Sequence, residues 1–250
     1  MTRPCRFMVL VLVVPLISSS CLFRDSPQGA ADELAAVSSS VADATYAAIY
    51  RFGVTGQLAG AVTTRMEVVQ DPPVSVRKLD TTTKPEEGEP ITLTSWFVRN
   101  ADGDYACTQY QDVGVRCLAD PIASGTFGSA QLDAFFDTPH EASSFTSVRK
   151  TSRPVRIQGE QGTCYEAVPA TSSDAEVATP EATLASERFR FELCYAEDGI
   201  LLRGRRTNLA EASGDTSASS VVELVSLSRV VEPRELRLPG QVVEPDAVRQ

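Results

Sequence analysis

Apolar and polar side chains alternate with a period of two along most of this chain. The alternation is clearest over residues 46–52 and 188–195, where every second side chain is apolar. This period is typical of strands that bury one face. Turn residues separate the runs, so we predict about nine to eleven strands, mostly antiparallel and joined by hairpins. Further strand-like runs lie at residues 62–69, 74–80, 91–99, 153–168, 200–209 and 221–231.

Two segments have the spacing of a helix instead. Residues 32–43 and residues 129–142 each carry apolar side chains three and four positions apart, which predicts one amphipathic helix in each segment. The apolar positions at this spacing are Leu34, Val37 and Val41 in the first segment and Leu132, Phe135 and Phe136 in the second.

These elements predict an α+β fold class that is dominated by β structure. Sequential hairpins favour one large curved antiparallel sheet, and each helix would cover part of its apolar face. We expect the folded domain to span residues 32–240 and an extended tail to follow at residues 241–250. Residues 171–186 and 211–219 are rich in small and polar side chains and are expected to be solvated loops.

The first twenty residues have the parts of a secretory signal. A basic start precedes the apolar residues 7–17, and small residues follow them. That apolar run would span roughly 16 Å as a helix, about half of a ~30 Å hydrocarbon core. We therefore predict a signal peptide at residues 1–20 rather than a permanent span, followed by a tether at residues 21–31.

A cysteine follows the small residues of this signal. Residues 17–21 resemble the lipobox of bacterial lipoproteins, in which the cysteine becomes the first mature residue and carries lipid. Ser18 stands where that family usually has leucine. The resemblance implies an exported protein that is lipid-anchored through Cys21 at the outer face of the cytoplasmic membrane or at the cell surface. Ordinary signal cleavage, which would leave Cys21 unmodified, is the alternative.

The six cysteines divide into groups. Cys5 leaves with the signal and Cys21 is the predicted anchor. The remaining even number in an exported chain indicates disulfides, and four cysteines allow three pairings. We favour the pair within the 105–117 hairpin and the pair between two strand-like runs. Metal binding is the alternative, but no CxxC spacing supports it. The favoured pairs are Cys107–Cys117 and Cys164–Cys194.

Charge and composition exclude several classes of function. The net charge is −10, which excludes a typical nucleic-acid binder because such proteins need a basic face. Residues 1–20 contain two arginines and no acid, so their removal changes the charge to −12 and disfavours contact with anionic lipid. A single histidine, His140, excludes multi-histidine zinc sites. No GxSxG, GxGxxG or GKS/T motif is present, so we expect no enzyme and no cofactor.

The other charged segments of the chain are explained by turns and solvent-exposed surface rather than by a functional site. Residues 100–104 predict a hairpin turn rather than a calcium loop. Glu86, Glu87 and Glu89 lie in an exposed connection and give no glycosidase pair. Four arginines would form a basic stripe if their strands are neighbours, and the alternative is a solvent face balanced by Glu187 and Glu192. These arginines are Arg188, Arg190, Arg203 and Arg205.

The order of the elements resembles the periplasmic lipoprotein-carrier superfamily, which includes the LolA, RseB, LppX and LprG types. The resemblance covers residues 32–240. It implies an unclosed half-barrel sheet with helices over its concave face and a hydrophobic ligand between them. It is carried by the helix before strand 46–52, the Asp71-Pro72-Pro73 break before Arg77, the strand–turn–strand at residues 194–202 and the closing Leu238-Pro239.

Three aromatic rows are the candidate lining of that cavity. The protein would then carry or sense a lipid or another apolar molecule. The alternative is a filled core in an envelope scaffold or interaction module that binds a protein partner. An enzyme is a third hypothesis and requires a polar cleft around His140. The candidate lining residues are Tyr46, Tyr50, Phe52, Leu132, Phe135, Phe136, Phe189, Phe191 and Tyr195.

Overall fold

A computed structural model gives the fold of the chain. It describes residues 27–55, 62–85, 87–110, 113–119, 130–136, 141–170, 189–208 and 219–243. The predicted signal peptide, Cys21, Glu86, His140 and Arg188 lie outside these ranges, as do residues 171–186 and 211–218.

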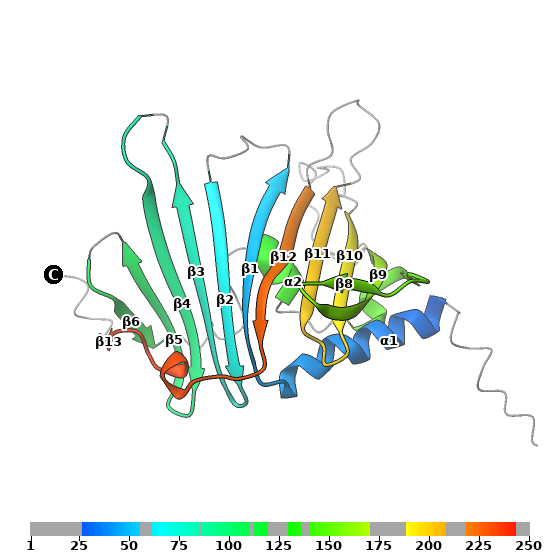
Figure 1. Cartoon of the computed structure of the whole chain (residues 1–250), viewed down its shortest axis with the longest axis horizontal. Helices are drawn as coiled ribbons and strands as arrows, with labels where there is room; N and C mark the ends of the chain where they lie inside the picture. Colours follow the sequence, from blue (N-terminus) through cyan, green and yellow to red (C-terminus); the bar gives the residue numbers. More distant parts are fainter. Residues whose placement is uncertain are drawn as a thin grey trace, which may run out of the picture.

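Within the described ranges, 13 strands form one sheet (Figure 1). The path through the sheet is β13-β6-β5-β4-β3-β2-β1-β12-β11-β10-β9-β7, and β8 also pairs with β9. The path ends at two different strands, so the sheet is unclosed. Neighbours are antiparallel except β13 and β6, which are parallel. The predicted α+β class, dominated by one open sheet, is confirmed.

Most elements match the alternating runs of the sequence. The strands are β1 (Tyr46–Thr55), β2 (Val62–Asp71), β3 (Val74–Thr83), β4 (Ile91–Asn100), β5 (Gly103–Tyr110), β6 (Arg116–Ala119), β7 (Phe145–Lys150), β8 (Val155–Ile157), β9 (Glu160–Pro169), β10 (Phe189–Ala196), β11 (Leu201–Asn208), β12 (Ser219–Ser228) and β13 (Gln241–Val242). The α-helices are α1 (Pro27–Ser40) and α2 (Ala130–Phe136), and the 3-10 turns are η2 (Val41–Asp43), η4 (Ala142–Ser144) and η5 (Pro233–Leu236).

Helix α1 begins at Pro27, earlier than the predicted start at Asp32. Proline suits the first position of a helix because its missing N–H has no partner there in any case. The helix ends in three serines whose hydroxyls bond to carbonyls one turn earlier; Ser40 Oγ donates to the Val37 carbonyl at 2.7 Å. Such bonds compete with the backbone hydrogen bonds of a helix, and α1 gives way to the 3-10 turn η2 directly after Ser40. None of the described helices is long and apolar enough to cross a membrane.

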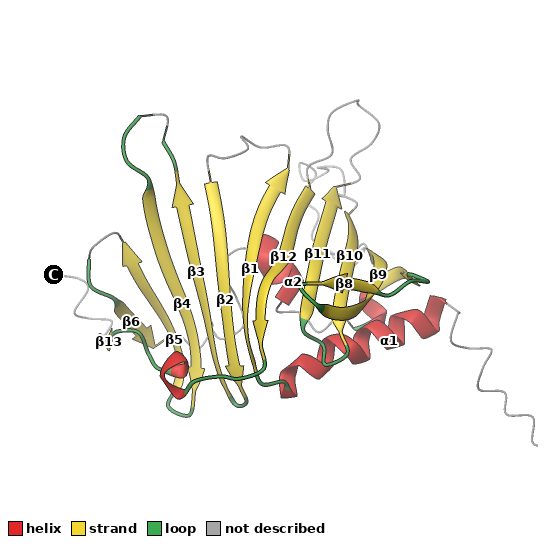
Figure 2. Cartoon of the chain, viewed as in Figure 1, coloured by secondary structure: helices red, strands yellow, loops and turns green. Residues whose placement is uncertain are grey.

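The main core lies between the two α-helices and strands β1, β2, β7 and β9–β12 of the sheet. Figure 2 shows α2 behind β1 and β12. Alternate side chains of each strand point to this helix-side face, as the period of two requires. Leu34 of α1, Leu132 of α2 and Leu193 of β10 are all buried in it. The predicted role of the helices, covering one apolar face, is therefore confirmed.

A smaller core lies on the opposite face of the sheet. Val69, Val76 and Val98 occupy paired positions on β2, β3 and β4, and all three are buried. The segment after β12 covers them with Leu236 and Leu238. Residues 229–243 therefore form a strap that crosses the sheet, which Figure 2 shows with η5 in front of the strands. The strap ends in β13, within the region predicted as an extended tail.

Three boundaries differ from the prediction. Helix α2 is described over residues 130–136 of the predicted 129–142 segment, whereas residues 129 and 137–140 lie outside the described ranges and Ala142 belongs to η4. The region 153–168 divides into β8 and β9 at the Gln158–Gly159 turn, where both residues have positive φ. The short β13 adds a strand because backbone groups of residues 241–243 bond to the edge of β6. Such short pairings leave no periodic signal in a sequence.

Candidate functional site

All nine predicted lining residues lie in or against the main core. Their strands place them on the helix-side face, and α2 places its three residues against that face. Six of them are buried and three are partly buried. The buried residues are Tyr46, Tyr50, Leu132, Phe135, Phe191 and Tyr195; the partly buried residues are Phe52, Phe136 and Phe189.

Helix α2 contacts these rows through two aromatic pairs. Phe136 meets Tyr50 edge to face with ring centroids 5.1 Å apart, and Phe135 meets Phe191 at 6.0 Å. Such edge-to-face pairs are a favoured geometry of buried rings. Phe135 also lies directly over Gly204 of β11, where a Cβ atom would come within 2.5 Å of the Phe135 ring. The rings therefore fill the space between helix and sheet.

A small void lies beside these rings. A cavity of about 50 Å³ lies between η2, α2 and the sheet. Its wall includes Tyr46, Tyr50 and Tyr195, with Gln70 and Arg77 at the polar side. Gln70 Nε2 donates to the carbonyl of Val41 at 2.6 Å and so fastens η2 to β2. A drug-sized ligand needs several times this volume, so the aromatic rows act as core in this conformation.

Burial dominates the acid–base behaviour of the core tyrosines. Burial raises the pKa of Tyr46 to about 12, although the Arg77 cation opposes the rise. The pKa of Tyr50 is raised well above its usual value by burial and, secondarily, by Tyr46 and Tyr195. Burial also raises the pKa of Tyr195, with Tyr165 adding to the effect. The ring hydroxyls of this core are therefore neutral at physiological pH.

A larger groove of about 590 Å³ separates α1 from the β8–β10 end of the sheet. Glu33 of α1 lines it and accepts a hydrogen bond from Lys150 Nζ at 2.5 Å. The Tyr165 hydroxyl also bonds to Glu33, and burial together with this carboxylate raises the pKa of Tyr165. Ala36 and Ser40 give the helix wall small side chains. No sequence pattern indicates this site, because Glu33 and Lys150 are 117 positions apart.

The far half of the helix-side face is more open. We call strands β4–β6 the wing. On this face Leu93 of β4 lies opposite Tyr110 of β5, and Leu118 of β6 lies opposite Ala106. Leu93 is 42% exposed, Tyr110 is 50% exposed and Leu118 is 38% exposed. Leu93 lies opposite Thr81 of β3, which in turn lies opposite Thr64. The wing therefore presents large apolar side chains to solvent beside the filled core.

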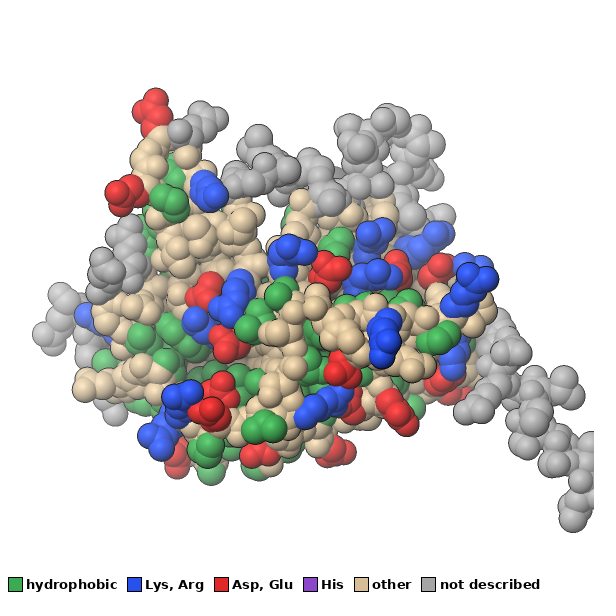
Figure 3. All heavy atoms as spheres, viewed as in Figure 1, with side chains coloured by type: hydrophobic (Ala, Val, Ile, Leu, Met, Phe, Trp, Pro, Cys, Tyr) green, Lys and Arg blue, Asp and Glu red, His purple; other side chains and the backbone are tan. Residues whose placement is uncertain are grey.

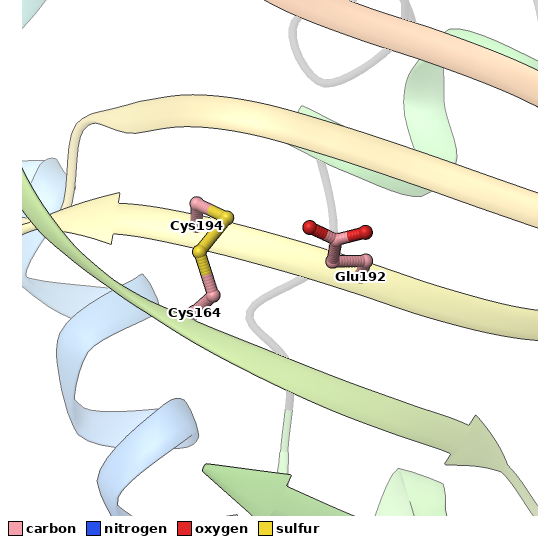
Figure 4. A group of neighbouring side chains, drawn as sticks. All are labelled: Cys164, Glu192 and Cys194. Carbon is pink, nitrogen blue, oxygen red and sulfur yellow. A yellow bond between two sulfur atoms is a disulfide. The ribbon is translucent and has the colours of Figure 1, made fainter. Parts of the chain in front are cut away.

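Both predicted disulfides are present. Cys107 pairs with Cys117 and Cys164 pairs with Cys194, each pair at opposite positions on neighbouring strands. Figure 4 shows Glu192 next to the second pair, on the same strand as Cys194. The two sulfurs are bonded to each other, and Glu192 accepts a hydrogen bond from Arg203 at 2.5 Å, so this cluster is not free to hold a metal ion. Two disulfides are typical of exported proteins.

The predicted arginine stripe exists in part. β10 and β11 are neighbours, and Arg190, Arg203 and Arg205 lie on the face opposite the helices. Arg203 bonds to Glu192, which agrees with the balanced alternative, whereas Arg190 and Arg205 form no ion pair with a described residue.

The predicted turn at residues 100–104 is also present: Asp102 N–H donates to Asn100 Oδ1 at 2.8 Å.

Comparisons with known proteins give a structural similarity but no family. No protein-family model and no curated protein matches the chain. Among solved structures, a crystal structure of MucB in complex with MucA(peri) is similar, with a TM-score of 0.45 and 13% sequence identity. The alignment covers 86% of this chain and 61% of that chain, so this chain spans less than two thirds of that protein's length.

Proposed function

We propose that this chain is an exported, lipid-anchored and non-enzymatic protein that binds a lipid or another apolar ligand on the helix-side face of the wing. Membership of the lipoprotein-carrier superfamily is part of this proposal. The observation that carries it is the uneven packing of one sheet face. Aromatic side chains fill that face over β1 and β9–β12, whereas Leu93, Tyr110 and Leu118 stand exposed on the wing.

Exposed apolar side chains of this size are informative when they gather on one face. Leu93 and Tyr110 are cross-strand neighbours, so their side chains form a continuous surface rather than scattered single residues. This surface continues from the buried core, because Phe97 on the same face packs against core residues. An apolar ligand on the wing would remove its area from water at roughly 25 cal/mol per Å².

The carboxylates beside the pockets support a non-enzymatic role. Glu33 is engaged by Lys150, and Arg229 bonds to both Glu160 and Asp198 at the neighbouring end of the groove. A general acid or base needs a perturbed carboxyl that faces its substrate. Carboxylates held in ion pairs at the surface are poor candidates for that work.

The lipid anchor has a direct test. We expect Cys21→Ala to release the protein from the membrane fraction, since the acyl chains attached there would provide most of its membrane affinity. Cys5→Ala is the matched control, because it removes a cysteine of the signal and leaves the predicted lipobox intact. Membrane fractionation followed by immunoblotting measures both variants. Retention of Cys21→Ala at the wild-type level would contradict the anchor.

Ligand binding on the wing is tested with a fluorescent fatty acid. We expect Leu93→Asp and Leu118→Asp each to weaken its binding at least about tenfold, because a carboxylate would be desolvated under the ligand. Both side chains are partly exposed, so the melting temperature should change little. Val230→Asp is the control, since Val230 is 74% exposed and lies on the strap. Equal affinity of all three variants and the wild type would overturn the proposal.

The filled core favours one alternative function. The cavity that described residues line between η2, α2 and the sheet is about 50 Å³, so the chain also suits a scaffold that binds a protein partner through its surface. Native mass spectrometry of the protein purified without detergent separates the two functions. A bound lipid that disappears in Leu93→Asp supports the ligand-binding proposal. A protein that is free of lipid and does not bind the fatty acid favours the scaffold.

A further inference from the structure

The face opposite the helices carries a cluster of arginines that the proposed function does not use. The strands β1, β7 and β9–β12 place them at paired positions on neighbouring strands. Arg149 lies opposite Glu166, Glu166 opposite Glu192, and Glu192 opposite Arg205. Figure 3 shows blue side chains gathered over β10 and β11 with red ones among them. We call this set the arginine face: Arg51, Arg149, Arg190, Arg203 and Arg205, with Glu166, Glu192 and Glu223.

The arginine face has an excess of positive charge in an acidic protein. Each glutamate has an arginine partner: Glu166 bonds to Arg149 at 2.8 Å, Glu192 to Arg203 at 2.5 Å and Glu223 to Arg51 at 3.1 Å. Arg190 and Arg205 remain, and both are exposed. They lie on a diagonal of adjacent strands, since Arg190 is opposite Thr207. Diagonal positions on neighbouring strands are about 7–8 Å apart along the backbone, so both arginines extend into solvent from the same part of the sheet.

We propose that the arginine face docks on an anionic phospholipid surface, with Arg190 and Arg205 bonding to lipid phosphates. Guanidinium groups bind phosphate oxygens in pairs of parallel hydrogen bonds, which suits a phosphate-covered surface. That the protein lies beside a bilayer rests on the proposed function. A lipid on Cys21 would hold Pro27, the first residue of α1, within about 20 Å of the bilayer. Figure 1 shows that α1 begins near the β8–β10 end of the sheet, and Arg149, Arg190 and Arg205 lie on strands β7, β10 and β11 of that end.

The exported chain has a net charge of −12 without residues 1–20, which disfavours contact of the protein as a whole with anionic lipid but does not oppose docking through the arginine face at close range. Charges further away than about 10 Å are screened at 0.1 M salt, so the groups that face the lipid decide the interaction. A protein docked in this way turns its helix-side face away from the bilayer. The exposed Leu93, Tyr110 and Leu118 would then remain available to a ligand instead of dissolving into the membrane.

The test measures how the exported chain without lipid, residues 22–250, partitions onto vesicles. These residues include every described element. The vesicles are phosphatidylcholine alone or with one third phosphatidylglycerol, at about 0.1 M salt. We expect binding only to the anionic vesicles and an about 30-fold lower partition coefficient for Arg190→Gln/Arg205→Gln. The control is Lys84→Gln/Arg116→Gln, which removes the same charge at exposed positions outside the arginine face and should change partitioning less than about twofold.

Three results would overturn the docking: equal binding to neutral and anionic vesicles, wild-type partitioning of Arg190→Gln/Arg205→Gln, or binding to polyglutamate without binding to vesicles. The last result would assign the arginine face to an acidic protein. The same variant is then tested with the fluorescent fatty acid. Because the two arginines and Leu93 lie on opposite faces of the sheet, its fatty-acid affinity should stay at the wild-type value, so failure of either proposal is recognised separately.

Discussion

Gly204 shows how one residue controls the closeness of helix and sheet. It lies on β11 under Phe135, and no side chain of any size fits between them. The edge-to-face contact of Phe135 with Phe191 depends on this approach. The sequence predicts Phe135 as an inward residue of a helix, but it carries no signal that the opposite position must be glycine, because the two residues meet only after the chain has folded.

We expect Gly204→Ala to lower the free energy of unfolding by about 1–3 kcal/mol, since a Cβ atom placed 2.5 Å from the Phe135 ring overpacks the core. Gly53→Ala is the control: it is also in a strand, and a Cβ there meets nothing within 4 Å. Urea unfolding measures both. A Gly204→Ala protein as stable as the control would show that α2 shifts without cost.

At the scale of elements, the two disulfides each join neighbouring strands of the sheet, but they close loops of different length. Cys107 and Cys117 connect the arms of one short hairpin, with 10 positions between them in sequence. Cys164 and Cys194 connect β9 to β10 across a separation of 30. Closing the longer loop removes more conformational freedom from the unfolded chain, so the second bond should contribute more to stability.

We expect Cys164→Ala/Cys194→Ala to lose nearly 4 kcal/mol of unfolding free energy and Cys107→Ala/Cys117→Ala to lose about 3 kcal/mol. Guanidinium unfolding of each double variant against the wild type gives both values. Each variant serves as a control for the other, because both remove a buried cross-strand bond. The opposite order of the two losses would contradict the loop-length argument.

The alternating pattern predicts the elements better than it predicts their contacts. Their spacing alone predicts that Tyr46, Tyr50 and Phe191 belong to inward rows, and all three are buried. Local periodicity specifies which face of a strand a side chain occupies. It does not specify how well other side chains fill the space over that face. The small cavity and the exposed wing therefore could not be predicted from the sequence. Ion pairs such as Glu33–Lys150 also depend on the folded arrangement.

At the scale of the whole molecule, four buried tyrosines couple stability to alkaline pH. Tyr46, Tyr50, Tyr165 and Tyr195 all have raised pKa values, and burial is the main cause in each case. The unfolded chain releases these protons near pH 10, whereas the folded chain retains them. The unfolded state therefore binds fewer protons above pH 10, and stability falls as pH rises.

We expect the contribution of these tyrosines to the free energy of unfolding to be constant below about pH 10 and to fall between about pH 10 and pH 12. The loss should be up to about 1.4 kcal/mol per pH unit for each tyrosine. Tyrosinate absorbance should then rise together with the loss of circular dichroism. Tyr46→Phe should make the decline less steep. Ionisation of all tyrosines in a protein that keeps its dichroism would contradict this coupling.

The pairing of β1 with β12 determines when folding can be completed. Ala47 lies opposite Ser228 at the centre of the sheet, so nearly the whole chain must be available before this ladder forms. The meander from β1 to β6 forms from local hairpins, but the edge of β1 then waits unpaired for a strand near the end of the chain. An exported chain that enters its compartment from the N-terminus would expose this edge until translocation ends. If the proposed export occurs, newly translocated molecules would pass through a stage in which edge-to-edge association competes with correct folding.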